Sequence, residues 1–381
     1  WTSTFDHARK SQYFMKDQSL RLAANYEIRL LYVPAYRKNV SFARLRNHVL
    51  LAEAFKRAVE KSPKPDIMIC SFPPIELALS TVRYGREHGV PVIVDVRDLW
   101  PDYFLDLVPG PFRPLARIAL QPYYLASREV FYGATHLIGI TDRFVEWALQ
   151  RAGRSRSEKD RAFPLGYPNT GVLPHNSVVA AEQFWTSLGV LGPPKQFVIC
   201  FFGSLSRLFE IDVILKAARI LKNGPFLFVI CGGGEKLDTF RAWSAQDSNV
   251  IFPGWVDAAR ITVLMRRSQV GLAPYRSERS MTMNIPNKPI EYMSAGLAVV
   301  SSLRGELENL LILHNCGVQY ENNNPQELAA VLGQLYRDPG RLEVIRRNAK
   351  DLYERKLKAE EVYSQLVSYL EHCADKEIRG E

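Results

Sequence analysis

Short apolar runs alternate with helical segments along this chain, and that alternation is the feature that most constrains its fold. In the first half, strands are expected at residues 26–32, 66–70 and 90–96, with helices at 41–59 and 75–88. Strands that alternate with helices in this way are typical of a parallel sheet covered by helices. The first half is therefore expected to form an α/β domain.

A second series of strands and helices begins with the apolar run at residues 196–202. Its later strands are expected at 225–231, 250–252, 270–273, 297–301 and 317–320. The segment between the two series, residues 171–194, is expected to be a linker with a short helix. We therefore expect two Rossmann-like doubly wound domains, residues 1–175 and 195–357, and a last helix, residues 358–381.

A Rossmann-like domain normally opens with a strand, a glycine-rich turn and a helix. The first four residues here have the character of a strand end, and no such turn follows them. We therefore expect the first strand and helix of this domain to precede Trp1.

Composition sets broad limits on function. The 381 residues are 47% apolar and 23% charged, which is ordinary for a globular protein of two or three domains. No apolar run reaches the roughly 20 residues that span a bilayer. The formal net charge of +9 favours anionic partners, namely nucleotides, diphosphates, anionic lipids or nucleic acid, without ranking them.

Cysteine and histidine give no sign of a metal site. Cys70, Cys200 and Cys231 end apolar runs, and no Cys-x-x-Cys pair occurs, which indicates buried reduced thiols in a cytosolic protein. The seven histidines lack metal-ligand spacing. We expect no bound metal and no cofactor.

Residues 284–302 carry the clearest site pattern. Pro289 suits the first residue of a helix that ends at Gly296. A helix start offers free N–H groups and a partial positive charge to an anion, and Lys288 adds a full charge beside it. Glu291 can accept hydrogen bonds from hydroxyl groups. An anion beside hydroxyls outlines a nucleotide-sugar, whereas the alternative is an ordinary helix whose Glu291 interacts only with the helix dipole.

This stretch resembles the donor-site motif of the retaining glycosyltransferases of family 4, Pro-x-Lys-x-x-Glu-Tyr-Met-x-x-Gly. The resemblance implies the GT-B fold, in which two Rossmann-like domains face a central cleft and the last helix, residues 358–381 here, returns to the first domain. It also implies metal-independent transfer of a hexosyl or N-acetylhexosaminyl group from a nucleotide-diphosphate donor, taken here to be a UDP-sugar. The run 95–102, together with residues 2–7, resembles a bacterial branch that builds surface polysaccharides, including lipopolysaccharide.

Glycine turns follow other strands of the second domain, and the resemblance implies that they contact the diphosphate and the base. The residues expected to bind the donor are Gly203, Ser204, Gly232, Gly233, Gly234, Trp255, Val256, Ile285, Pro286, Asn287, Lys288 and Glu291. The residues expected to act in catalysis are Asp98, Arg207, Lys288 and Glu291. Lys288 and Arg207 would stabilise the leaving diphosphate, and Glu291 would orient the ribose.

Three positions of the second domain depart from the family pattern. Ser204 follows the first glycine, and Glu210 stands where the family often has a lysine. Met283 stands where many members have a second glutamate. Lys288 is therefore expected to be the main cation at the diphosphate, and a degenerate, inactive transferase stays open as an alternative.

The acceptor is expected to contact the first domain. His7, Arg97 and Asp98 are the candidates, because family members commonly carry His-Asp where this chain has Arg97-Asp98. Asp98 would position the acceptor hydroxyl. The alternative is that Asp98 only caps a local turn or helix and that Arg97 only forms a salt bridge.

Residues 112–132 are rich in aromatic residues and arginine. This pattern fits either a helix at a membrane interface or a packing helix with solvated arginines. We expect a cytoplasmic enzyme whose acceptor is a saccharide or a polyprenyl-linked saccharide, and peripheral contact with the inner face of the cell membrane stays open.

Two rival functions remain. One is a GT-B sugar-nucleotide epimerase, against which the lack of a clear cluster of histidines and carboxylates counts. The other is a basic protein that binds nucleic acid or anionic membrane without catalysis. Scattered arginines and the absence of an RNA-binding motif argue against nucleic acid, which we do not expect as a partner.

Overall fold

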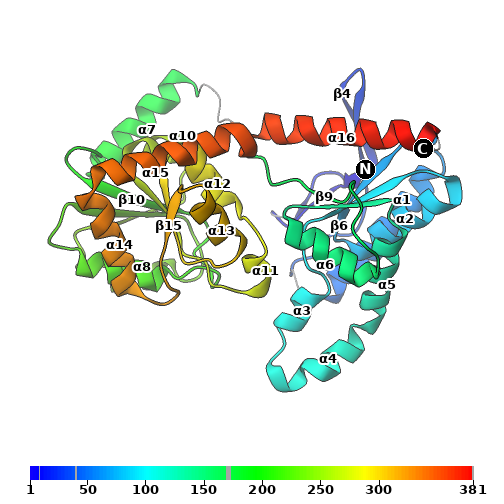
Figure 1. Cartoon of the computed structure of the whole chain (residues 1–381), viewed down its shortest axis with the longest axis horizontal. Coiled ribbons are helices and arrows are strands. Elements are labelled where there is room, and N and C mark those ends of the chain that lie inside the picture. Colours follow the sequence, from blue (N-terminus) through cyan, green and yellow to red (C-terminus); the bar gives the residue numbers. More distant parts are fainter. Residues whose placement is uncertain (8, 39–40, 169–172, 380–381) are drawn as a thin grey trace. The chain divides into compact units, whose positions relative to one another are not determined.

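The structure, a computed structural model, describes residues 1–7, 9–38, 41–168 and 173–379. It divides into two compact units (Figure 1). Unit 1 comprises Trp1–Phe163 and Leu366–Glu381, and unit 2 comprises Pro164–Gln365. The first segment of unit 1 therefore ends at Phe163, whereas the first domain was expected to extend to residue 175. Residues 169–172, part of the expected linker, lie outside the described residues.

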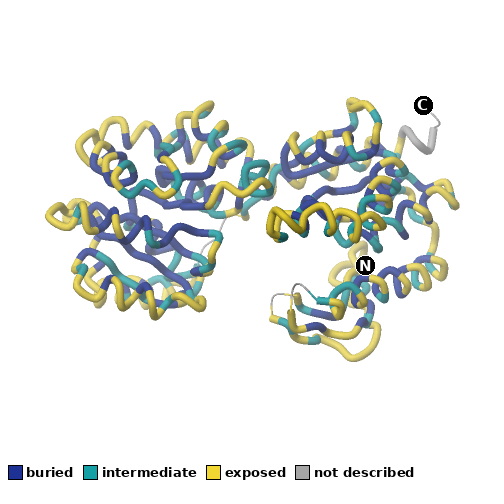
Figure 2. Tube along the Cα trace, turned by 90° about the horizontal axis from the view of Figure 1, so that it is seen from below, coloured by how far each residue is buried: buried dark blue, intermediate teal, exposed yellow. Residues whose placement is uncertain are grey.

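Unit 2 is built on one sheet of six parallel strands in the order β12-β11-β10-β13-β14-β15. The strands are β10 (Phe197–Phe202), β11 (Phe226–Cys231), β12 (Val250–Gly254), β13 (Val270–Ala273), β14 (Ala298–Ser301) and β15 (Gly317–Gln319). This order is that of a Rossmann fold, with its topological switch point between β10 and β13. The four inner strands, β10, β11, β13 and β14, are buried throughout, whereas the edge strands β12 and β15 are mostly half-buried. Figure 2 shows buried segments inside this unit and exposed segments around them. The expected α/β class with Rossmann-like units is confirmed.

Nine α-helices are described in unit 2 before the last helix of the chain. They are α7 (His175–Ser187), α8 (Ile211–Ile220), α9 (Leu237–Trp243), α10 (Ala258–Arg267), α11 (Arg279–Thr282), α12 (Asn287–Ser294), α13 (Glu306–Leu313), α14 (Pro325–Arg337) and α15 (Pro339–Leu352). The segment expected as a linker contains α7. Trp185 of α7 is fully buried, and its indole N–H donates to the Arg260 carbonyl of α10 over 2.8 Å. This burial makes α7 part of the core of unit 2.

Unit 1 contains two larger sheets and a short hairpin. Four parallel strands lie in the order β6-β7-β8-β9, and a three-stranded sheet has the order β1-β5-β4 with β4 antiparallel to β5. The strands are β1 (Thr2–Ser3), β2 (Phe5–Asp6), β3 (Ser11–Gln12), β4 (Gln18–Ala23), β5 (Tyr26–Leu31), β6 (Met68–Phe72), β7 (Val92–Val96), β8 (His136–Gly139) and β9 (Arg161–Ala162). The last strand of this sheet, β9, ends just before Phe163.

The helices described in the first segment of unit 1 are α1 (Phe42–Val59), α2 (Ile75–His88), α3 (Asp102–Asp106), α4 (Arg113–Ala119), α5 (Gln121–Gly133) and α6 (Asp142–Ala152). Helices α1 and α2 agree with the helices expected at 41–59 and 75–88, whereas α3 was not expected. Ser41 caps α1 by accepting from the Arg44 N–H over 3.3 Å. Residues 112–132 form mainly α4 and α5, because Pro122 starts a new helix after Leu120. Figure 1 shows α4 at the tip of a projection from this unit.

The last helix, α16 (Ala359–Arg379), follows a π-helical turn at Tyr353–Leu357, where a break was expected. It begins in unit 2 and belongs to unit 1 from Leu366 onward. There Tyr369 and Cys373 are buried in a small core, and the Tyr369 hydroxyl donates to the Lys159 carbonyl over 2.7 Å. The end of the chain therefore completes the core of unit 1.

Among the described helices, none is both long enough and apolar enough to cross a membrane. All five cysteines are buried, as was expected of Cys70, Cys200 and Cys231.

Candidate active site

A cavity of about 480 Å³ lies in unit 2, where β10, β11 and β12 end and α12 begins. Its lining comprises Phe202, Gly203, Ser204, Cys231, Gly232, Gly233, Trp255, Val256, Ile261, Asn287, Lys288 and Glu291. Ligands of open α/β sheets bind outside the carboxyl ends of the strands, at the switch point of strand order. The cavity therefore occupies the place where this fold binds its ligands, and it gathers nine of the twelve residues expected to bind the donor.

The glycine turns at this edge pack against one another. Gly203 has φ of 152°, and a Cβ there would lie 2.3 Å from Cε of Lys288. Gly232 has φ of 140°, and a Cβ there would lie 1.8 Å from the Gly203 carbonyl oxygen. The Gly203 N–H donates to the Cys231 carbonyl, and the Gly232 N–H donates to the Gly254 carbonyl. Glycine is required here so that the turns meet and Lys288 has room across them.

Helix α12 begins at Asn287, two residues before the expected start at Pro289. Pro286 precedes it in an extended conformation, and no side chain caps the helix. Pro289 still lies in the first turn, where a missing N–H costs no intrahelical hydrogen bond. Asn287 and Lys288 therefore bring the helix start, with its outward N–H groups, to the wall of the cavity.

The Lys288 side chain is largely buried beside an aromatic ring. Its Nζ lies 4.8 Å from the ring centroid of Phe209. Burial lowers the pKa of Lys288, and the charge of Glu291 partly opposes this shift. An anion that entered the cavity would raise this pKa again, since it would favour the charged ammonium group.

Glu291 has a partner that the sequence did not indicate. The Tyr167 hydroxyl donates to Glu291 Oε1 over 2.7 Å. Burial raises the pKa of Glu291, while this hydrogen bond and Lys288 lower it. Tyr167 is itself fixed, because its N–H donates to the Leu357 carbonyl and its carbonyl accepts from the Ala359 N–H. No local pattern in the sequence marks Tyr167.

Three of the expected donor-binding residues do not line the cavity. Gly234 has φ of 154°, and a Cβ there would lie 2.9 Å from the Leu205 carbonyl oxygen. Ile285 packs against the core, and Pro286 precedes α12. Trp255, by contrast, is 78% exposed and borders the cavity, while the neighbouring Val256 is buried.

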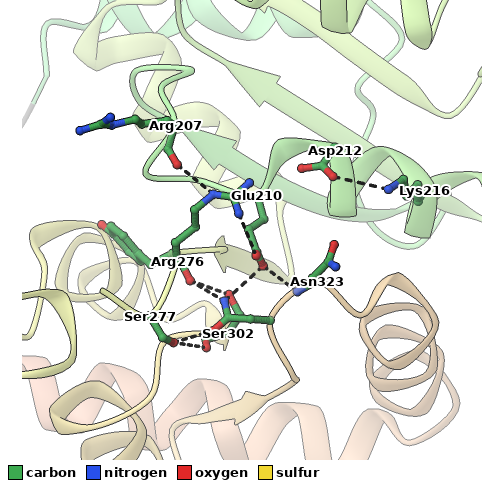
Figure 3. A network of polar contacts seen from close by, with 10 residues as sticks. Arg207, Glu210, Asp212, Lys216, Arg276, Ser277, Ser302 and Asn323 are labelled. Carbon is green, nitrogen blue, oxygen red and sulfur yellow. Dashed lines mark hydrogen bonds and ion pairs between the residues drawn. The ribbon is translucent and has the colours of Figure 1, made fainter. Parts of the chain in front are cut away.

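Figure 3 shows Arg207 and Glu210, which follow β10. The Arg207 side chain is exposed and does not line the cavity, while its carbonyl accepts from Arg276 Nε over 3.0 Å. Its contact with a diphosphate stays a prediction. The buried Glu210 carboxylate accepts from the Asn323 N–H over 3.0 Å and lies 3.7 Å from Arg276 Nη1. Glu210, which stands where the family often has a lysine, therefore links the segment after β10 to the segments around Arg276 and Asn323 in unit 2. Met283 lies half-buried just before α12.

Arg97 and Asp98 follow β7 in unit 1. Arg97 Nε donates to Asp95 Oδ2 over 2.6 Å, so this arginine takes the salt-bridge alternative. Asp98 Oδ1 accepts from the Leu99 N–H over 2.8 Å. Burial raises the pKa of Asp98, and hydrogen bonds from Leu99 and Trp100 oppose that shift.

His7 and Asp98 share a neighbour, Arg44 of α1, which the sequence did not indicate. Burial is the largest cause of the lowered pKa of His7, and the positive charge of Arg44 adds to it. The same charge partly opposes the rise that burial causes in the pKa of Asp98. His7 Nδ1 also contacts the Tyr36 hydroxyl. Of the three residues expected to bind the acceptor, His7 and Asp98 thus both interact electrostatically with Arg44, whereas Arg97 forms an ion pair with Asp95.

Across the part of the chain that the structure describes, no three His, Cys, Asp or Glu side chains gather closely enough to hold a metal ion.

Two family models match the chain. Residues 17–166 match the glycosyl transferase 4-like domain, and residues 196–338 match the glycosyl transferases group 1 domain. The chain belongs to glycosyltransferase family 4. No curated protein sequence matches this glycosyltransferase significantly.

Solved structures with the same fold include three glycosyltransferase-related proteins. Sucrose-phosphate synthase from Thermosynechococcus elongatus is 15% identical with a TM-score of 0.69, and the match covers 98% of this chain and 87% of that one. HepE from Anabaena, in complex with UDP-glucose, is 17% identical with a TM-score of 0.59 over 88% and 84%. WaaG, a glycosyltransferase involved in lipopolysaccharide biosynthesis, is 17% identical with a TM-score of 0.52 over 83% and 84%. These likenesses establish the GT-B fold of this glycosyltransferase.

Proposed function

We propose that this glycosyltransferase moves a hexosyl or N-acetylhexosaminyl group from a UDP-sugar to a saccharide hydroxyl, with retention of configuration. The observation that carries the proposal is the cavity of unit 2, where Lys288 and Glu291 stand at the start of α12 beside the glycine turns. The UDP-glucose complex of HepE, which has the same fold, supports the choice of donor.

The chemistry follows from the charges at this site. As the bond between the sugar and the diphosphate breaks, the diphosphate gains negative charge, which Lys288 and the N–H groups at the start of α12 stabilise. Glu291 accepts hydrogen bonds from the ribose hydroxyls. The acceptor hydroxyl attacks from the side of the leaving group and passes its proton to a diphosphate oxygen, so Asp98 needs only to position it. Since Lys288 supplies the cation, activity is expected without added divalent metal.

The acceptor is proposed to be a saccharide or a lipid-linked saccharide of a surface polysaccharide. WaaG, which shares the fold, acts in lipopolysaccharide biosynthesis. Helix α4 exposes Leu115 and Ile118 beside Arg117, a combination that suits peripheral contact with an anionic membrane surface. We place the reaction at the cytoplasmic face of the membrane.

Thermal unfolding with UDP, GDP, ADP and CMP, each with a chelator present, tests the donor. A ligand that binds only the folded state raises the melting temperature by mass action, and UDP is expected to give the largest rise. The next experiment would measure the turnover of UDP-sugars in the presence of a saccharide acceptor. If no nucleoside diphosphate shifts the melting temperature, the proposal of a nucleotide-sugar donor is wrong.

A further inference from the structure

A second cavity, of about 410 Å³, lies entirely within unit 1. Four aromatic rings and two leucines line it: Phe42, Trp100, Phe104, Tyr123, Leu45 and Leu120. Among its described lining residues, Arg44 is the one that carries a charge. The volume falls within the roughly 300–1,000 Å³ of small-molecule sites, and the apolar lining favours a hydrocarbon ligand.

Trp100 connects this cavity to the expected acceptor residue. Its ring is 2% exposed, packs 4.5 Å from Phe104 and lies 4.7 Å below the Arg44 guanidinium. The Trp100 side chain also hydrogen-bonds to the carboxylate of Asp98. The apolar wall and the carboxylate proposed to position the acceptor therefore belong to one rigid cluster.

The polar end of the cavity carries positive charge. Arg44 Nε lies 3.4 Å from Nε2 of His48, whose pKa is lowered to about 4 by burial, so that this histidine is neutral near pH 7. Burial also raises the pKa of Glu76, which lies 3.8 Å from His48. Arginine forms charge-assisted hydrogen bonds with phosphate, so Arg44 is the group of this lining that would bind an anion.

We propose that this cavity holds the first carbons of a lipid tail of the acceptor, a prenyl or alkyl chain joined to a phosphate, with the phosphate bound by Arg44. This inference rests on the proposed transfer function. A free saccharide has no hydrocarbon to fill an apolar cavity beside Asp98, whereas a lipid-linked saccharide phosphate supplies both the chain and the anion. The acceptor class is thereby narrowed to lipid phosphates.

A series of n-alkyl phosphates of increasing length, below their micellar concentrations, tests the cavity by calorimetry or by quenching of tryptophan fluorescence. Affinity is expected to rise about fourfold for each buried CH₂ and to stop rising once the cavity is full. The matching alkanols are expected to bind about tenfold more weakly or worse. Affinity that rises without a plateau, or the absence of binding, would overturn the proposal.

Two variants locate the binding on the molecule. Arg44→Gln is expected to abolish the preference for phosphate over alkanol while the dependence on chain length persists. Leu120→Asp is expected to weaken binding about tenfold or more, because a carboxylate then enters the lining. Leu115→Asp is the matched control, since Leu115 lies on the neighbouring α4, is 69% exposed and does not line the cavity. Equal losses in the two aspartate variants would show adsorption to the exposed helix instead.

Binding of UDP to unit 2, measured on the same samples, separates the two proposals. UDP binding without alkyl phosphate binding contradicts the lipid cavity alone. Alkyl phosphate binding without UDP binding contradicts the proposed donor. A UDP-induced rise in melting temperature that persists in Leu120→Asp shows that unit 2 is folded, and far-UV circular dichroism checks unit 1. If Leu120→Asp does not fold, the proposal is tested with Arg44→Gln alone.

Discussion

Lys288 and Glu291 lie close together on α12, and burial moves each of them toward its neutral form. It lowers the pKa of Lys288 and raises that of Glu291, and each charge partly restores the other. A diphosphate beside Lys288 and hydroxyls beside Glu291 would favour both charged forms. The pair is therefore arranged to gain stability when a donor binds.

Substitution Lys288→Met keeps the length of the side chain and removes its charge. We expect the affinity for UDP to fall by about 10- to 100-fold, the range for a lost hydrogen bond to a charged group. Uridine, which lacks the diphosphate, is the control and should bind the variant as it binds the unchanged protein. Calorimetry measures both, and equal losses for UDP and uridine would contradict a specific role at the phosphates.

Tyr167→Phe removes the hydrogen bond that lowers the pKa of Glu291, so that pKa should rise further. If donor binding needs the ionised carboxylate, the KM for a UDP-sugar increases as pH falls through this pKa. In the variant, that increase should begin at a higher pH, with kcat little changed at the alkaline end. Assays between about pH 5 and pH 8 test this, and a profile that does not move would remove Tyr167 from the positioning of Glu291.

At the residue scale, the sequence indicated candidate site residues that lie close together within one short stretch of the chain. Lys288 and Glu291 belong to one helix start, where spacing and charge are visible in a short stretch. Tyr167 reaches Glu291 across a separation of 124 residues, and Arg44 acts on His7 and Asp98 from a different helix. Such contacts are created by tertiary packing and leave no local pattern.

At the scale of elements, the turns after β10 and β11 line the cavity of unit 2. We expect Gly232→Ala to destabilise unit 2 by roughly 3 kcal/mol, from backbone strain at positive φ and from overlap with the Gly203 carbonyl. Gly233→Ala is the matched control, because a Cβ there meets nothing within 4 Å. Its effect should stay within about 0.5 kcal/mol. Urea unfolding measures both, and similar costs would contradict the packing of the turns.

Strongly patterned elements were predicted well from the sequence, and weakly patterned ones were not. Helix α2 has the expected bounds, because its apolar face is regular and Gly89 ends it at φ of 60°. Strand β4 was not expected, because it is largely exposed and so lacks an alternation of buried apolar residues. Helix α7 was placed in a linker because its burial depends mainly on Trp185, whose pocket forms only against α10.

At the scale of the whole molecule, the two units should respond separately to substitution and to ligand. Tyr369→Ala removes a buried ring from the core of unit 1, which is expected to cost about 3–5 kcal/mol there. The affinity of unit 2 for UDP should be unchanged. Tyr363→Ala on the same helix is the control, because Tyr363 is 44% exposed. Calorimetric unfolding with and without UDP tests this, and a loss of UDP affinity in Tyr369→Ala would contradict independent units.

The fold class was predictable because strand and helix alternate throughout, and this alternation survives errors of a few residues at each boundary. The limit of unit 1 was harder to place. The segment after Phe163 pairs through Tyr167 with the residues around Lys358, so the chain enters unit 2 before any break in the apolar pattern. The sequence shows where elements lie and does not show which core they join.

The division of the chain also has a consequence during protein synthesis. Unit 2 is one continuous segment, Pro164–Gln365, whereas unit 1 is assembled from the two ends of the described sequence. A ribosome delivers all of unit 2 before it delivers Tyr369 and Cys373, which fill the small core under β7 and β8. Although domains usually fold in the order of their synthesis, unit 2 can complete its core first, while unit 1 waits for the last helix.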